Sequence, residues 1–285
     1  MPEASLYEYR LEGVYAGGLP DAPPVLYDPA RHLPPDVASE SLAGYDGQAA
    51  LRRVDSKKGS GADTPLRVLV PGIGVGTLAC SFLAHEQKQQ ALGATPIHID
   101  GFDIDPSAVD LAKRNLSGYT TTRFSCNIYQ ADWNRTETWE SLSPHAYNLI
   151  LFNPPYLPDA EASVIRASYA QVPKTATAGG KDGLDHFRRV IPQLPSLMDH
   201  RNGSTLLFRF RTPGNEQAKA LHDICADAFG GMTWPSGLFP TEGMANERLD
   251  KDGRLRWLSY GRIILHPQRS SNVVRSAAPN QKHQV

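Results

Sequence analysis

The stretch that decides the fold is Leu149-Ile150-Leu151-Phe152-Asn153-Pro154-Pro155-Tyr156. Its four consecutive apolar residues predict a strand that is buried on both faces, as in a parallel sheet. Proline lacks the N–H that a sheet ladder needs, and the residue before a proline is pushed towards an extended backbone. The strand is therefore expected to end at Asn153, followed by a stiff turn. Ligands of open α/β sheets bind at the carboxyl ends of strands, so this turn is a candidate ligand site.

The groups on this turn suit a planar nitrogen. The carbonyls of Pro154 and Pro155 and the side chain of Asn153 accept hydrogen bonds, and Tyr156 offers a flat aromatic face. Two acceptors beside a ring can hold an NH2 group and point the nitrogen lone pair at an electrophile. The four residues alone are equally compatible with an ordinary turn, so the rest of the chain has to decide.

Composition and charge favour a globular protein. Of the 285 residues, 40% are hydrophobic and 21% are charged, which is typical of a chain with a real core. The net charge of −1 gives no strong attraction to nucleic acid or to a membrane surface. No stretch has the length of a membrane span and no signal peptide is recognisable at the start, so a cytoplasmic protein without a membrane partner is expected. The widely spaced Cys80, Cys126 and Cys225 indicate neither a disulfide framework nor a metal site.

The chain divides into three parts by composition. Residues 1–64 are rich in proline and are expected to form a partly irregular extension or lid, with short strands near residues 7–9, 14–15 and 25–27 and one helix over 39–54. Residues 56–61 are predicted to be a flexible linker. Residues 65–266 are expected to form the main domain, and residues 267–285 a flexible tail.

The main domain begins with a strand over residues 66–70 and a helix over 77–90. Between them lies the turn Pro71-Gly72-Ile73-Gly74-Val75-Gly76. This order brings backbone N–H groups and a helix N-terminus up to a ligand, and glycine permits close approach. The turn contributes the candidate ligand-binding residues Pro71, Gly72, Gly74 and Gly76. A tight strand–helix turn without a ligand is the alternative.

Two further strands end in carboxylates. The strand over 97–103 ends at Asp103, which can accept both hydroxyls of a ribose, and Ile104 follows it. Asp105 is the better cap for the helix over 106–115, which leaves Asp103 for the ligand. The strand over 124–129 leads to Asp132, which can accept from an adenine amino group, with Trp133 or Ala131 against the base. A surface acid is the alternative for Asp132.

The remaining elements complete an α/β pattern. The strand that contains the apolar run is expected over 147–152, followed by a long loop and a helix over 185–198. Further strands are expected at 205–208, 232–234 and 262–265, with a helix that begins at 215. Alternating strands and helices predict a Rossmann-like, doubly wound sheet, here with seven strands.

Taken together, the glycine turn, Asp103, Asp132 and the Asn-Pro-Pro-Tyr turn resemble class I S-adenosylmethionine-dependent methyltransferases that modify planar nitrogens. Later landmarks narrow the resemblance to the glutamine N5-methyltransferase family, whose best-known members modify release factors. These landmarks are Pro173, the stretch Gly179-Gly180-Lys181-Asp182-Gly183-Leu184, Arg188, Glu216-Gln217-Ala218 and Gly261-Arg262. The resemblance spans residues 66–266 and implies that residues 65–266 are a methyltransferase domain with S-adenosylmethionine as cofactor.

The resemblance also implies roles for the candidate residues. Asn153 and the Pro154 carbonyl would accept hydrogen bonds from the two N–H groups of the nitrogen to be methylated. Tyr156 would stack on the plane of the group that carries this nitrogen. His186 is interpreted as a helix-surface histidine without a role. No metal is expected. The cofactor-binding residues would be Pro71, Gly72, Gly74, Gly76, Asp103, Ile104, Asp132, Trp133 and Asn153.

The chain departs from the pattern of the glutamine N5-methyltransferases in three places, and these bear on the binding of the methyl acceptor and of the cofactor. Val70-Pro71 stand where the family has an acid before its first glycine, and Tyr147-Asn148 stand where it has an aspartate before the strand. Residues 1–64 do not resemble the helical N-terminal domain of the release-factor enzymes. The methyl acceptor is therefore expected to be another protein or a small molecule.

Two other functions stay open at this point. The first is methylation of an exocyclic base amine in nucleic acid, with phosphate contacts from Arg248, Lys251, Arg254 and Arg256, although the near-zero net charge does not favour it. The second is a binding subunit that kept the fold and lost turnover, which the Val70-Pro71 change would permit.

Overall fold

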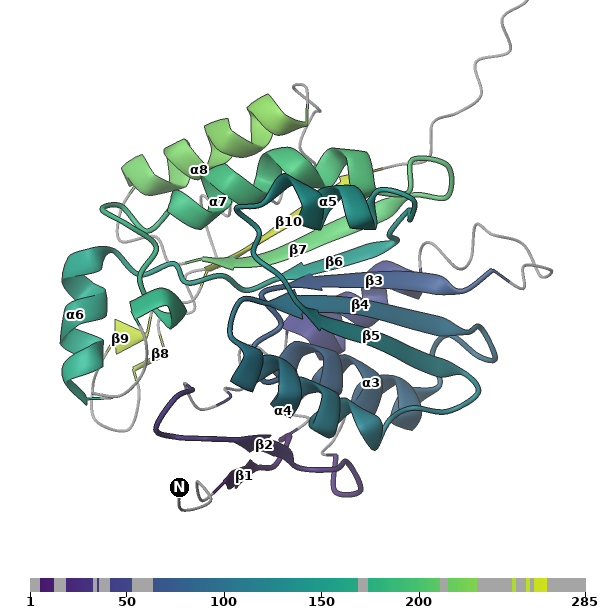
Figure 1. Ribbon diagram of the computed structural model, residues 1–285. Helices are drawn as coiled ribbons and strands as arrows, with labels where there is room; N and C mark the ends of the chain where they lie inside the picture. Colours follow the sequence, from purple (N-terminus) through teal and green to yellow (C-terminus); the bar gives the residue numbers. More distant parts are fainter. Residues whose placement is uncertain are drawn as a thin grey trace, which may run out of the picture.

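A computed structural model describes residues 6–12, 19–32, 35, 42–52, 64–168, 174–210, 215–229, 248–249, 255–256 and 259–265. Its main feature is a six-stranded sheet with the order β10-β7-β6-β3-β4-β5 (Figure 1). The strands are β3 (Leu66–Pro71), β4 (Ile97–Asp103), β5 (Phe124–Gln130), β6 (Leu149–Phe152), β7 (Ser204–Phe210) and β10 (Ser259–Leu265). All pairs are parallel except β10 with β7. The predicted Rossmann-like, doubly wound α/β sheet is confirmed, and the seventh predicted strand, at 232–234, lies outside the described residues.

The order of the strands reverses direction at β3. The chain runs from β3 outward to β4 and β5, and then returns to the other side of β3 with β6 and β7. Such a switch point leaves a crevice at the carboxyl ends of the two strands that flank it, and open α/β sheets bind ligands there. The glycine turn follows β3 and the Asn-Pro-Pro-Tyr turn follows β6, so both lie at this crevice.

Helices cover both faces of the sheet, as Figure 1 shows. One face carries α3 (Thr77–Gln89) and α4 (Pro106–Ser117), and the other carries α5 (Thr136–Leu142), α7 (Asp185–Val190) and α8 (Asn215–Ala228). The residues of β6 alternate between the two layers: Leu149 and Leu151 pack with α3, and Ile150 and Phe152 pack with α7. All four are fully buried, which confirms the prediction from their uninterrupted apolar run.

Four predictions about the main domain are wrong in detail. Residues 185–198 do not form one helix, because α7 ends at Val190 and a 3₁₀ segment, η4 (Ile191–Leu197), follows; Pro192 and Pro195 cannot donate the bonds of an α-helix. Residues 157–178 are not one long loop but contain α6 (Asp159–Ser168) and η3 (Lys174–Ala176). Tyr147 precedes β6 and only bridges to Met198. The helix α5 was not anticipated.

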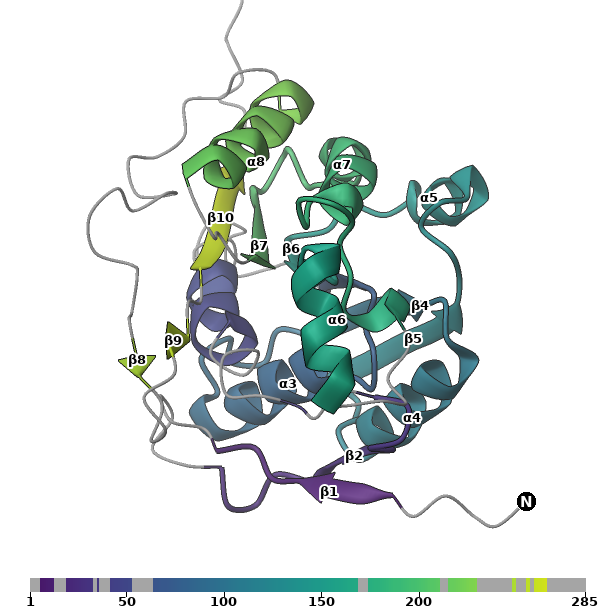
Figure 2. The ribbon, with the colours of Figure 1, turned by 90° about the vertical axis from the view of Figure 1, so that its left-hand side faces the viewer.

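The N-terminal strands pack on the main domain. β1 (Tyr7–Tyr9) and β2 (Val25–Tyr27) pair antiparallel, and Figure 2 shows them below α3 and α4. The side chain of Asn115 on α4 exchanges two hydrogen bonds of 2.9 Å with the backbone of Leu26. Its amide also donates to the Val75 carbonyl at 2.8 Å. The predicted strands at 7–9 and 25–27 are thus confirmed, and Asn115 ties them to the glycine turn. The strand expected at 14–15 lies outside the described residues.

Other predictions about the ends of the chain are only partly covered. The expected helix over 39–54 is a π-helical segment, η2 (Leu42–Gly47), that continues as α-helix to residue 52, and its remaining residues lie outside the described part. The predicted linker at 56–61 and tail at 267–285 also lie outside it. Two short strands, β8 (Arg248–Leu249) and β9 (Leu255–Arg256), form a pair of their own. Among the described residues, no helix is both long and apolar enough to span a membrane.

Candidate active site

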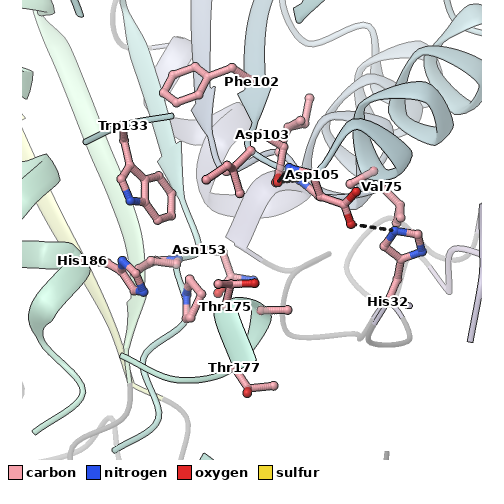
Figure 3. Close-up of a pocket in the computed structure, with 18 of the residues that line it drawn as sticks. His32, Val75, Phe102, Asp103, Asp105, Trp133, Asn153, Thr175, Thr177 and His186 are labelled. Atoms are coloured by element: carbon pink, nitrogen blue, oxygen red, sulfur yellow. Dashed lines mark hydrogen bonds and ion pairs between the residues drawn. The ribbon is translucent and has the colours of Figure 1, made fainter. Parts of the chain in front are cut away.

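A cavity of about 350 Å³ lies at the switch point, a volume within the usual range of small-molecule sites. Figure 3 shows Trp133, His186 and Asn153 along one side of it, and Asp103, Asp105 and His32 along the other. The predicted site residues that line the cavity are Gly72, Gly74, Asp103, Ile104, Asp132, Trp133, Asn153, Pro154 and Tyr156. Sequence positions that are more than 80 residues apart therefore meet in one place.

Two of the predicted site residues do not line the cavity. Pro71 is the buried last residue of β3. Gly76 caps α3 with a φ of 93°, and a Cβ atom added there would lie 3.4 Å from the Cα of Ala112. Gly76 therefore allows the start of α3 to approach α4, whereas Pro71 ends β3, and the cavity wall is built by their neighbours in the turn.

The other two glycines of the turn differ in what surrounds them. Gly72 has a φ of +64°, and a Cβ there would lie 2.8 Å from the indole ring of Trp133. Gly74 has a φ of +55°, and a Cβ there would meet nothing within 4 Å. Both backbones need the left-handed region that glycine tolerates. Gly72 thus makes room for Trp133, and Gly74 borders open space on the cavity side.

Asp103 lies at the end of β4 and holds the glycine turn. Its Oδ2 atom accepts a hydrogen bond from the Gly74 N–H at 2.9 Å, and its Oδ1 atom accepts from the Asp105 N–H at 3.0 Å. Burial raises the pKa of Asp103 above its ordinary value, although both hydrogen bonds act in the opposite direction. Asp105 caps α4 by accepting from the Ser107 N–H at 2.8 Å. The prediction that Asp105 is the cap is confirmed.

Asp132 and Trp133 follow β5 at the same end of the sheet. The Oδ1 atom of Asp132 accepts from the backbone and side-chain nitrogens of Asn134 at 2.8 and 2.7 Å, which fixes a tight turn. The ring of Trp133 meets the Phe152 ring edge-on at 6.0 Å between centroids and lies 5.0 Å from the His186 ring. Trp133 therefore joins the glycine turn to the residue that precedes Asn153.

The Asn-Pro-Pro-Tyr turn is supported by the glycine stretch 179–184. A Cβ on Gly179 would lie 2.8 Å from the Pro155 carbonyl oxygen, and a Cβ on Gly183 would lie 2.3 Å from the Tyr156 carbonyl oxygen. The Gly179 N–H also donates to the Leu157 carbonyl at 2.8 Å. The two glycines are required because the two backbones touch, so this stretch fixes the shape of the turn.

His186 corrects an interpretation made from the sequence. It is half-buried and lines the cavity, so it is not a helix-surface histidine. Its Nε2 atom lies 3.1 Å from the Ala178 carbonyl oxygen, which assigns the proton to Nε2, and its Nδ1 atom is buried without a hydrogen bond from any described residue. Burial is the main cause that lowers its pKa, and the charge of Arg189 adds to it. His186 thus brings a neutral imidazole to the site.

Sequence reasoning also missed Arg209 and His32. Arg209 lies on β7, lines the cavity, and could have been noticed as a charge inside the apolar run of 206–210. His32 comes from the N-terminal extension, where its Nε2 atom lies 3.8 Å from the Asp105 carboxylate and 3.3 Å from the Ser107 hydroxyl. Burial lowers the pKa of His32, against the opposing effect of Asp105. Nothing in the local sequence of His32 indicates this contact.

Comparison with known proteins adds sequence relatives. No protein-family model matches the chain. A release factor glutamine methyltransferase of Geobacter sulfurreducens is 28% identical over 135 residues, which cover 46% of this chain and 41% of the relative. A ribosomal protein uL3 glutamine methyltransferase of Bradyrhizobium diazoefficiens is 28% identical over 198 residues, which cover 68% of this chain and 54% of the relative. The matched part thus spans about half or less of the length of these relatives.

Solved structures give a weaker likeness. An S-adenosylmethionine-dependent methyltransferase of Agrobacterium tumefaciens has a TM-score of 0.40 and 14% identity, and the match covers 67% of this chain and 50% of that one. The sequence relatives point to a narrower group of proteins than this structural match does. In sequence, the chain is similar to the protein glutamine methyltransferases, the family that its Asn-Pro-Pro-Tyr turn and its glycine stretch 179–184 resemble.

Proposed function

We propose that this protein is an enzyme that transfers a methyl group from S-adenosylmethionine to a planar nitrogen, of the amide type, on a protein acceptor. One observation carries the proposal: the Asn153–Tyr156 turn and the glycine turn after β3 border the same cavity at the switch point of the sheet. The sequence relatives, which are named as glutamine methyltransferases, support the amide as the acceptor group.

The residues of the cavity fit the proposed cofactor. Gly74 borders open space where a side chain would interfere, and Asp103 places a carboxylate at the end of β4, where a ribose would lie. Asp132 and Trp133 supply an acceptor and an aromatic face for a base. When bound, S-adenosylmethionine supplies an electrophilic methyl group on a positively charged sulfur.

The chain itself would supply alignment. An amide nitrogen is a poor nucleophile because its lone pair is delocalised. Hydrogen bonds from its two N–H groups to Asn153 and to the Pro154 carbonyl would raise the electron density on nitrogen and orient its lone pair. The nitrogen would gain the methyl group and lose one of its two protons to water. A well-oriented pair of reactants gains about 7–11 kcal/mol over free encounter. Tyr156 lines the cavity beside these acceptors and would lie on the plane of the amide.

The acceptor and its setting are also proposals. The relatives are named for methylation of release factors and of ribosomal protein uL3, which supports a protein acceptor and a cytoplasmic location. Residues 1–64 would act as an extension that lids the cavity and takes part in acceptor recognition. Arg31, His32 and Pro35 from this extension line the cavity, which supports that role.

The test combines binding and turnover. Calorimetric titration should give micromolar affinity for S-adenosylmethionine, and Asn153→Ala should keep most of that affinity while turnover with the true acceptor falls by about 100-fold or more. Asn127→Ala is the matched control, because Asn127 is exposed on β5 and does not line the cavity. Full turnover by Asn153→Ala would refute the role of the turn, and absence of cofactor binding by the wild type would refute the function.

A further inference from the structure

Arg209 lies beside the Asn-Pro-Pro-Tyr turn because of the register of the sheet. Phe152 of β6 pairs with Phe208 of β7, so Arg209 stands at the level of Asn153 on the neighbouring parallel strand. Residues at matching levels of adjacent strands point to the same face of a sheet. Arg209 is only 8% exposed, yet it lines the cavity. The register therefore places a buried arginine next to the proposed acceptor nitrogen.

The guanidinium of Arg209 is held over an aromatic ring of the same turn. Its central carbon lies 5.7 Å from the centroid of the Tyr156 ring, which is within the range of a cation–π interaction. A guanidinium is planar and presents paired donors that match both oxygens of a carboxylate. The geometry therefore holds an arginine in the part of the cavity where the acceptor would enter.

The charges around the cavity are separated along the sheet. Among the described residues that line it, the carboxylates are Asp103, Asp105 and Asp132. Asp103 ends β4, and the other two follow β4 and β5. Arg31, the other lining arginine, is exposed and precedes His32, which contacts Asp105. Arg209 of β7 lines the cavity beside the Asn-Pro-Pro-Tyr turn. The acidic side suits a ribose and a base, whereas a guanidinium at the β7 side suits a group of negative charge.

We infer that Arg209 binds a carboxylate of a ligand at the β7 side of the cavity. This inference rests on the proposed function. Two sources have this chemistry: an acidic side chain next to the methylated amide of the acceptor, and the amino-acid carboxylate of the cofactor itself.

The experiment separates the two sources with two measurements on Arg209→Gln. First, S-adenosylmethionine and 5′-methylthioadenosine, which lacks the amino-acid carboxylate, are titrated into both proteins. Second, methyl transfer is measured to two peptides with one glutamine each, flanked by glutamates in one and by alanines in the other. Arg114→Gln is the matched control, because Arg114 is exposed on α4 away from the cavity. Arg209→Lys keeps the charge in case the glutamine variant folds poorly.

A loss of at least tenfold in affinity for S-adenosylmethionine, with unchanged affinity for 5′-methylthioadenosine, assigns the carboxylate to the cofactor. Unchanged cofactor affinity, together with a tenfold preference of the wild type for the acidic peptide that disappears in Arg209→Gln and partly returns in Arg209→Lys, assigns it to the acceptor. Either result supports the inference. Unchanged cofactor affinity without an Arg209-dependent peptide preference overturns it. Failure of the proposed function would show separately, as a wild type that binds neither nucleoside.

Discussion

The carboxylate of Asp103 accepts a hydrogen bond from the N–H of Gly74 at 2.9 Å, across 29 positions of sequence. This bond ties the end of β4 to the turn that follows β3. One side chain therefore does two things: it fixes the path of the glycine turn, and it lines the cavity at the position proposed for a ribose. A change at Asp103 is therefore expected to affect both the cavity wall and the path of the glycine turn.

The first prediction follows from that coupling. Asp103→Ala should lower the affinity for S-adenosylmethionine by at least about tenfold, or roughly 1.4 kcal/mol, because it removes an acceptor for the ribose and releases the glycine turn. Calorimetric titration measures the change. Asp110→Ala is the control, since Asp110 is exposed on α4 and does not line the cavity. Equal affinity of the Asp103 variant and the control would contradict the assignment.

A second prediction separates backbone strain from steric contact in the glycine turn. Gly72 and Gly93 have similar φ values of +64° and +55°, but an added Cβ meets Trp133 at 2.8 Å in the first and nothing within 4 Å in the second. Alanine in the left-handed region costs about 1–2 kcal/mol at either position. Gly72→Ala should therefore lose more free energy of unfolding than Gly93→Ala, measured by urea denaturation. Equal losses would mean that Trp133 moves aside without cost.

The parts of the structure that the sequence predicted are those with local causes. The strand β6 follows from an apolar run that two prolines end. The role of Asp105 follows from its position before Pro106 at the start of a helix. The course of the sheet follows from alternating strands and helices. In each case residues that are close together in the chain determine the local structure, so this structure can be predicted from a single sequence.

The parts that were missed depend on contacts between distant segments. His186 enters the cavity because α7 packs against the turn after β6, and Arg209 enters because β7 pairs with β6 in one particular register. The helix α6 escaped prediction because it has no long apolar face, and its Val164 is 70% exposed. The break after α7 was in the sequence, as Pro192 and Pro195, and was not given enough weight.

A third prediction concerns the residue before β6, where the family pattern has an aspartate. The Nδ2 atom of the buried Asn148 donates to Asp199 at 2.9 Å, and its Oδ1 atom accepts from the Arg67 N–H at 3.0 Å. Burial raises the pKa of Asp199, but hydrogen bonds from Asn202, Arg201 and Asn148 outweigh it, so the net direction is down. Asp199 is therefore charged at neutral pH.

An aspartate at position 148, as in the sequence pattern that the chain resembles, should thus be harmful in this chain. Asn148→Asp replaces a donor with a second carboxylate and should lower the free energy of unfolding by about 2–4 kcal/mol at pH 7, measured with urea. Adding Asp199→Asn in the same protein returns one donor to the pair and should recover part of the loss. A variant as stable as the wild type would show that Asn148 and Asp199 are not coupled.

The last prediction uses the pH dependence of His186. Because burial lowers its pKa, the folded state binds fewer protons than the unfolded state from the ordinary value of 6.5 down to the folded-state pKa. The stability that comes from the neutral imidazole is present above pH 6.5 and is lost as the pH falls through the folded-state pKa. His32 has a shift in the same direction, so the wild type carries both contributions.

His186→Phe removes one of the two contributions. At pH 8 it should be less stable than the wild type by about 1–3 kcal/mol, because the Ala178 carbonyl loses its donor. The difference in free energy of unfolding between the two proteins should narrow between pH 6.5 and 5, because only the wild type is then destabilised by protonation of His186. Urea denaturation at several pH values measures this, with His200→Phe as control because His200 is exposed. A gap that stays constant with pH would show that His186 is protonated equally easily in both states, and that its neutral form is not imposed by the fold.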